Sequence, residues 1–97
     1  MTPRFSVRTS REFDRLARRL TDQHPQEFPR RYAEAVEILE TDPHNISRRH
    51  PLLKLKGVRP GDGQYRLRLG RFRFRYDITG NVVELVRCAL RREDTYG

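Results

Sequence analysis

The chain has little of what stabilises or targets many small proteins. Among its 97 residues there is one cysteine, Cys88, which excludes an intrachain disulfide. Because Cys88 lies in an apolar run, we interpret it as a core residue of a protein kept in the reducing cytoplasm. No apolar run approaches the roughly 20 residues of a membrane span, and residues 1–11 lack the apolar region of a signal peptide. We therefore expect a cytoplasmic protein without membrane contact.

Standard catalytic constellations are also missing. His24, His44 and His50 share no metal-ligand spacing, and the sequence has no zinc-type Cys/His cluster. It also has no glycine-rich phosphate loop and no nucleophile elbow. We therefore expect a site that uses neither a metal ion nor a cofactor.

Positive charge is what the chain has in excess. It carries 21 basic against 13 acidic residues, a formal net charge of +8, and all the basic residues except Lys54 and Lys56 are arginines. The planar guanidinium fork binds phosphate through two donors and stacks on bases, which favours a nucleic-acid partner. A biased genomic base composition would give the same preference for arginine.

Residues 64–78 contain the clearest pattern. Apolar side chains alternate with charged ones on both sides of Gly70, and a period of two is typical of β-strands. Gly70 and Arg71 fit a tight hairpin turn, because glycine readily adopts the positive φ that such a turn needs. The apolar residues then share one face, and the other face carries Arg66, Arg68, Arg73 and Arg75. An anionic partner would explain four charges of one sign on one patch, although a merely solvated sheet face is the alternative.

The rest of the chain predicts an α+β domain. We expect a strand at residues 5–9, a helix capped by Ser10, a second helix that ends at Asp42-Pro43, and a last strand at residues 82–90. The long loop between residues 42 and 63 contains a segment, residues 52–55, that either adds a short strand or packs on an edge. It could also carry His50, Lys54 and Lys56 to the basic face. The expected fold is a single domain over residues 1–97, of order β-α-α-β-β-β, with both helices on one face of an antiparallel sheet.

In this order of elements the chain resembles the RelE/ParE superfamily of bacterial toxins. The resemblance rests on the first strand, the two helices ending at Asp42-Pro43, the Leu55-Lys-Gly57 segment, the core at residues 65–73, and the closing residues 91–96. It implies a RelE-like, microbial ribonuclease-type fold. It also implies a toxin whose partner is a RelB-like antitoxin encoded by the adjacent gene.

The RelE-like branch of this superfamily cleaves mRNA without a metal, typically on the ribosome. In this branch the site consists of basic residues on two strands and of an arginine and a tyrosine near the C-terminus. The resemblance therefore implies catalytic roles for the residues at the matching positions, Arg66, Arg68, Arg73, Arg92 and Tyr96. Further RNA contacts are expected from Lys54, Lys56, Arg75 and Arg91. Two alternatives remain open, a ParE-like inhibitor of DNA gyrase and a non-catalytic module that binds RNA or the ribosome.

The general base is a separate question. Arg66 and Arg68 stand where the best-known RelE proteins have lysines, and arginine stays protonated, so it is a poor base. Tyr96 is the first candidate, since surrounding arginines favour its phenolate, although it could instead stack on a base. The alternatives are Glu93, Asp94 and His50, and the two carboxylates could simply balance the charges of Arg91 and Arg92.

Overall fold

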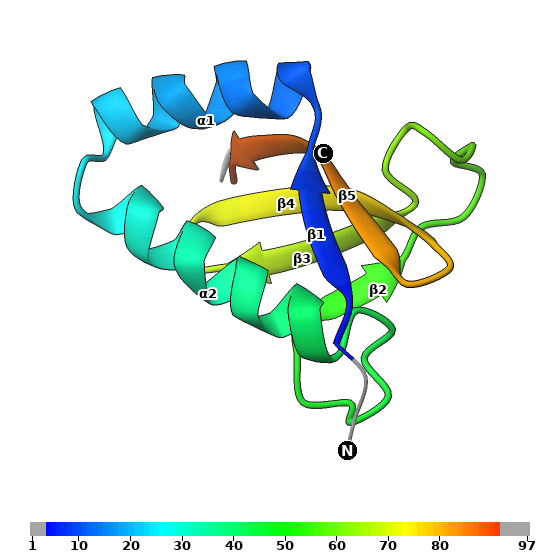
Figure 1. The fold of residues 1–97 in the computed structure, drawn as a ribbon. Helices are drawn as coiled ribbons and strands as arrows, with labels where there is room; N and C mark the ends of the chain where they lie inside the picture. The colour runs from blue at the N-terminus through cyan, green and yellow to red at the C-terminus, as the bar shows by residue number, and fades with distance from the viewer. Residues whose placement is uncertain (1–3, 92–97) are drawn as a thin grey trace.

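The alternating and helical patterns of the sequence produce the elements they predict. The structure, a computed structural model, describes residues 4–91 (Figure 1). Its elements in chain order are β1 (Ser6–Thr9), α1 (Arg11–Gln23), α2 (Glu27–Thr41), β2 (Leu52–Lys54), β3 (Tyr65–Leu69), β4 (Phe72–Thr79) and β5 (Val82–Leu90). The segment at residues 52–55 therefore does contribute a short strand.

Both helices begin and end for local reasons. The Ser10 hydroxyl accepts a hydrogen bond from the Phe13 amide at 3.0 Å, which caps α1 as expected. The chain leaves α2 at Asp42, because the ring of Pro43 disfavours helical backbone angles for the residue before it. The Tyr76 hydroxyl donates to the Pro43 carbonyl at 2.8 Å and so fixes this end of α2 to the sheet.

The five strands form one sheet in the order β1-β5-β4-β3-β2. Strands β2 to β5 pair in antiparallel fashion, but β1 pairs with β5 in parallel, so the expected fully antiparallel sheet is corrected to a mixed one. The Ser6 amide donates to the Asn81 carbonyl at 2.9 Å and the Ser10 amide to the Leu85 carbonyl at 3.0 Å, and these bonds hold β1 along β5 in the same direction. The direction of such a pairing between distant segments is not visible in the local sequence pattern. The α+β class with two helices on a sheet is confirmed.

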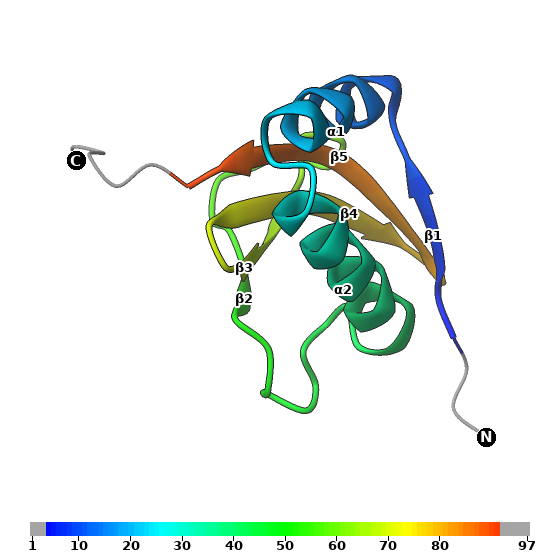
Figure 2. The ribbon, with the colours of Figure 1, turned by 90° about the vertical axis from the view of Figure 1, so that its left-hand side faces the viewer.

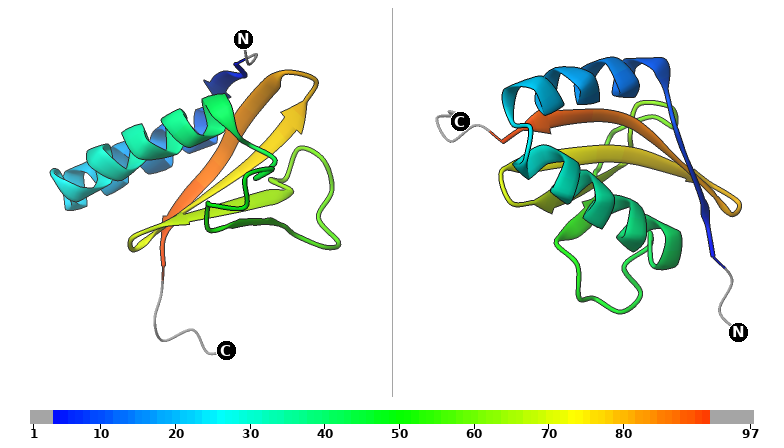
Figure 3. Two further views of the ribbon diagram at one scale, coloured as in Figure 1. Left: turned by 90° about the horizontal axis from the view of Figure 1, so that it is seen from below. Right: turned by 60° about the vertical axis from the view of Figure 1, so that its left-hand side comes forward.

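The helices pack on one face of the sheet and leave the other face open (Figures 2 and 3). Among residues 4–91, five of the 14 buried residues in the core between the layers are aromatic, and the rings of Phe28 and Phe72 lie 5.2 Å apart at their centroids. Cys88 is 2 % exposed and belongs to this core, as predicted. In the part of the chain that the structure describes, no helix is long and apolar enough to cross a membrane.

Candidate nucleic-acid interface

The hairpin of β3 and β4 places four arginines on the sheet face that the helices do not cover. Arg66 lies opposite Arg75, and Arg68 lies opposite Arg73. We call this surface the arginine face. Each like-charged cross-strand pair disfavours folding by a few tenths of a kcal/mol, so the arrangement contributes nothing to stability. The predicted alternation of apolar and basic sides is confirmed.

A β-bulge in β5 brings Arg87 beside the arginine face, and the Arg87 Nη2 also lies 3.8 Å from the Glu12 carboxylate of α1. The pairing of β4 and β5 shifts between Arg75 and Tyr76, and as a result Arg87 lies opposite Arg75. The same alternation continues from Arg87 through Ala89 to Arg91, which is exposed and follows directly after β5. Sequence reasoning missed Arg87, because its position in the alternation depends on the bulge.

Charges on the arginine face influence one another. The pKa of Arg66 is lowered, first by burial and then by the positive charges of Arg73, Arg68, Arg75 and Arg91. The Nε atoms of Arg66 and Arg73 are buried and have no hydrogen-bond partner. Among residues 4–91, no carboxylate lies within 4.0 Å of the guanidinium nitrogens of Arg66, Arg68 or Arg73. These three arginines therefore form a cationic site with unused donors.

Arg75 has a different environment. Its Nε donates to the Gly63 carbonyl at 2.8 Å and its Nη2 to the Asp62 carbonyl at 3.0 Å. The buried carboxylate of Asp77 accepts from the amides of Gly61, Gly63 and Gln64 at 2.9–3.1 Å. Arg75 and Asp77 thus fix the loop before β3 against the sheet, next to the arginine face.

The two lysines lie elsewhere. Lys54 pairs with Tyr65 in the register of β2 and β3, and its Nζ lies 5.8 Å from the centroid of the Tyr65 ring. The Tyr65 ring stacks on the core residue Tyr76, which places Lys54 on the helix-covered side of the sheet. On the other side of the sheet, Leu53 is the residue of β2 that lies opposite Arg66. The expected approach of Lys54 to the basic face is therefore wrong. Lys56 is exposed in the loop after β2.

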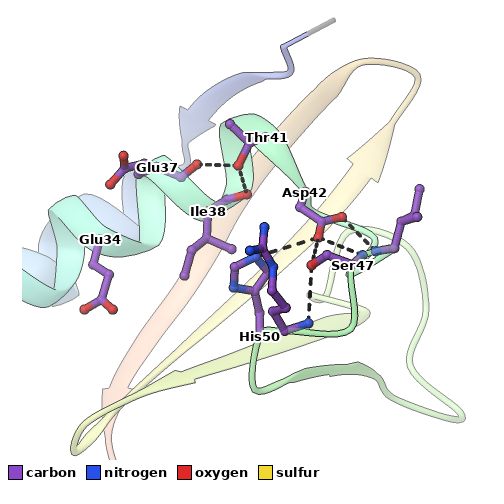
Figure 4. A pocket seen from close by; sticks show the side chains of 9 residues that line it. Glu34, Glu37, Ile38, Thr41, Asp42, Ser47 and His50 are labelled. Atoms are coloured by element: carbon purple, nitrogen blue, oxygen red, sulfur yellow. Dashed lines mark hydrogen bonds and ion pairs between the residues drawn. The ribbon is translucent and has the colours of Figure 1, made fainter. Parts of the chain in front are cut away.

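His50 is also remote from the arginine face. Its Nε2 is 3.7 Å from the Asp42 carboxylate, and it lines a pocket of about 660 Å³ together with residues of α2 such as Glu34 and Ile38. Figure 4 shows His50 turned toward Asp42 beneath the end of α2. Because α2 covers the opposite side of the sheet, the structure does not bring His50 together with the arginines.

The C-terminal candidates Arg92, Glu93, Asp94 and Tyr96 lie outside the described residues. Within the described residues, Tyr32 and Tyr76 are poorly suited to act as bases. Burial raises the pKa of Tyr32, and it raises that of Tyr76 further, while the Tyr76 hydroxyl is already engaged as a donor. Across residues 4–91, no group of three or more His, Cys, Asp or Glu side chains could hold a metal ion.

Comparison with known proteins identifies the fold. No protein-family model matches the chain, and no curated protein sequence matches it significantly. Among solved structures, the archaeal RelE–RelB complex from Pyrococcus horikoshii contains a chain with 27 % identity and a TM-score of 0.66, and the match covers 96 % of this chain and 99 % of that one. A chain of the toxin–antitoxin complex RelBE2 from Mycobacterium tuberculosis matches with 26 % identity and a TM-score of 0.56 over 94 % of both chains.

Proposed function

We propose that the chain is the toxin of a type II toxin–antitoxin system. Its fold is that of the RelE family, as the resemblance in the sequence led us to expect. We further propose that it acts as a metal-independent endoribonuclease on mRNA, at the ribosome. The single observation that carries the enzymatic part is the cluster of Arg66, Arg68 and Arg73. Their charges are unneutralised by any carboxylate of residues 4–91.

Such a cluster suits a phosphodiester in two ways. Guanidinium groups donate paired hydrogen bonds to phosphate oxygens, and these charge-assisted bonds are about twice as strong as neutral ones. They also stabilise the additional negative charge that develops on phosphorus during the reaction. Since the three side chains project from two adjacent paired strands, the sheet holds them in place before RNA arrives.

The reaction that fits these residues is an in-line transfer within the RNA. The 2′-oxygen attacks the adjacent phosphorus, the bond from phosphorus to the 5′-oxygen breaks, and the products are a 2′,3′-cyclic phosphate and a free 5′-hydroxyl. One group must take the proton of the 2′-hydroxyl, and another must supply a proton to the departing 5′-oxygen. In this proposal Arg66, Arg68 and Arg73 hold the phosphate, and Arg92 stabilises negative charge on the leaving group. Tyr96, as its phenolate, takes the proton of the 2′-hydroxyl, and solvent water supplies the proton to the departing 5′-oxygen.

The test is expression of the wild-type protein in cells, followed by mapping of mRNA 5′ ends. We expect growth arrest together with new 5′ ends inside coding regions. The matched variants are Arg66, Arg68 and Arg73 changed together to Gln, and Arg11, Arg15 and Arg18 of the exposed α1 surface changed together to Gln. Both remove three charges, but only the first set should abolish cleavage.

Three other results would contradict the proposal. Intact transcripts alongside stalled replication would indicate a gyrase inhibitor, and ribosome binding without cleavage would indicate a non-catalytic module. Equal loss of cleavage in both triple variants would mean that net charge, not the arginine face, is responsible.

The proposed partner is a RelB-like antitoxin encoded next to this chain. One similar structure is described as a RelE–RelB complex and the other as the toxin–antitoxin complex RelBE2. An acidic segment laid over the arginine face would remove the repulsion among its side chains and block RNA. Coexpression of the neighbouring gene should restore growth, and unimpaired growth on expression of this chain alone would argue against a toxin.

A further inference from the structure

A second pocket lies on the sheet face that carries the arginines, farther along β4 from Arg73 and Arg75. It has a volume of about 420 Å³, and the residues around it include Arg8, Pro60, Gln64, Asp77, Val82 and Glu84. These come from the three neighbouring strands β1, β5 and β4 and from the loop before β3 (Figure 1). The pocket contains charges of both signs beside apolar side chains, unlike the purely cationic arginine face.

Three charged residues cross this pocket in a row. Arg8 pairs with Glu84 in the register of β1 and β5, and Glu84 pairs with Asp77 in that of β5 and β4. The oxygens of Asp77 are already used by the amides of the loop. Within the described residues, however, Arg8 and Glu84 make no side-chain hydrogen bond and no ion pair, with each other or with another residue. Their donors and acceptors are available to a ligand.

The chemistry of this pocket fits a nucleobase better than a phosphate. Two carboxylates repel a phosphate, but a carboxylate readily accepts hydrogen bonds from the edge of an unstacked base. Guanine presents two adjacent donors, N1–H and N2–H, which match the two oxygens of Glu84. It also presents the acceptors O6 and N7, the pair that arginine binds in bidentate fashion. The apolar surfaces of Pro60 and Val82 offer contact to the flat ring.

We propose that this pocket binds a guanine base of the RNA strand whose phosphates lie on the arginine face. This inference rests on the proposed function. Along β4, Asp77 lies two residues beyond Arg75 and four beyond Arg73, which corresponds to about 7 and 13 Å at the rise of a β-strand. A base in the pocket therefore belongs to a nucleotide close to the one whose phosphate the arginines hold, and Glu84 and Arg8 determine specificity.

The test uses short RNAs that differ only in the base at one position near the cleaved bond, on either side of it. Cleavage rates are measured for the wild type, for Glu84→Gln and Arg8→Gln, and for the control Glu37→Gln on the exposed surface of α2. A second arm measures binding of the same RNAs by fluorescence anisotropy, with a 2′-deoxy nucleotide at the cleaved position to block the reaction. If cleavage requires the ribosome, the same base changes are placed in an mRNA on programmed ribosomes.

We expect the wild type and Glu37→Gln to favour guanine at one position by about 5- to 100-fold, the usual size of a bidentate base contact. Glu84→Gln should reduce that preference to within about twofold, because an amide offers only one acceptor. An unchanged preference in Glu84→Gln, or an indifferent wild type, would overturn the inference. If the wild type cleaves no RNA, the proposed function fails, and the binding arm still decides whether the pocket selects guanine.

Discussion

Gly63 and Gly57 both adopt positive φ, but their surroundings differ. Gly63, at φ +83°, lies so close to the sheet that an added Cβ would meet Arg75 Cβ at 2.8 Å and Val86 Cγ2 at 2.9 Å. Gly57, at φ +76°, has open space around it. Glycine at residue 63 therefore serves the contact between loop and sheet as well as the backbone conformation.

This difference gives a stability prediction at the level of one residue. Gly57→Ala should cost about 1 kcal/mol, the ordinary penalty of an alanine in left-handed geometry. Gly63→Ala should cost about 1–3 kcal/mol more, because the loop must also move away from Arg75 and Val86. Urea unfolding of the two variants measures the difference, and equal losses would mean that the loop does not pack on the sheet as described.

Tyr96 supports a second prediction at this scale. If it takes the proton of the 2′-hydroxyl, Tyr96→Phe should bind RNA normally and cleave it roughly 10² to 10⁴ times more slowly. Tyr96→Ala should lose binding as well if the ring stacks on a base. Nearly full activity of Tyr96→Phe, with Tyr96→Ala much impaired, would leave Tyr96 as a stacking residue. The base would then be sought at Glu93 or Asp94, since His50 lies under α2.

At the scale of elements, the end of α2 is joined to the following loop by one carboxylate. Asp42 accepts from the amides of Ile46 and Ser47 at 2.7 and 3.1 Å and from the Ser47 hydroxyl at 2.6 Å. Burial works to raise the pKa of Asp42, but these hydrogen bonds and nearby His50 outweigh it and the pKa is lowered. The ionised carboxylate therefore stabilises this loop.

The stability that Asp42 contributes should depend on pH in one direction. A lowered pKa in the folded state means that the contribution is complete above the unfolded value of about 3.9 and is lost as the pH falls below it. In urea unfolding, Asp42→Asn should be less stable than the wild type from pH 7 to 5, and the gap should close below about pH 4. The exposed Asp22→Asn is the control, and a gap that persists undiminished at pH 3 would contradict the role of the charge.

The β3–β4 hairpin combines a structural cost with the proposed binding role. Arg68 lies opposite Arg73 and adds to the lowered pKa of Arg66. Arg68→Gln should therefore stabilise the free protein by about 0.2–1 kcal/mol at low salt while weakening RNA binding, and added salt should shrink the gain. The exposed Arg19→Gln on α1 should change stability by less than about 0.5 kcal/mol. Loss of stability in Arg68→Gln would mean that the arginine face holds the fold together.

At the scale of the whole molecule, the distribution of charge matters more than its sum of +8. Only arginines that contact phosphates release counterions, so each replacement of Arg66, Arg68 or Arg73 should lower the slope of log affinity against log salt concentration by about 0.7 to 1. Arg15→Gln removes the same charge from α1 and should leave the slope unchanged. RNA binding measured between 50 and 200 mM salt separates these cases. Equal slopes for all the variants would show that RNA binds through the general field of the protein.

The sequence by itself determined the elements and the alternation within them. Helical spacing after Ser10 and the period of two around Gly70 are local properties, set by how each residue type fits its own segment of backbone. For the same reason, it could be predicted without knowing the fold that Arg66 and Arg68 lie on the other face of the sheet from the core residues of the hairpin.

Only the tertiary structure decided what depends on the pairing of distant segments. The parallel alignment of β1 with β5, the register that turns Lys54 toward Tyr65, and the bulge that brings Arg87 opposite Arg75 are properties of two strands, and a shift of one residue moves a side chain to the opposite face. The same holds for Asp77, an ordinary alternating residue in the sequence. Its carboxylate acquires a role only because the loop at residues 61–64 brings three amides to it.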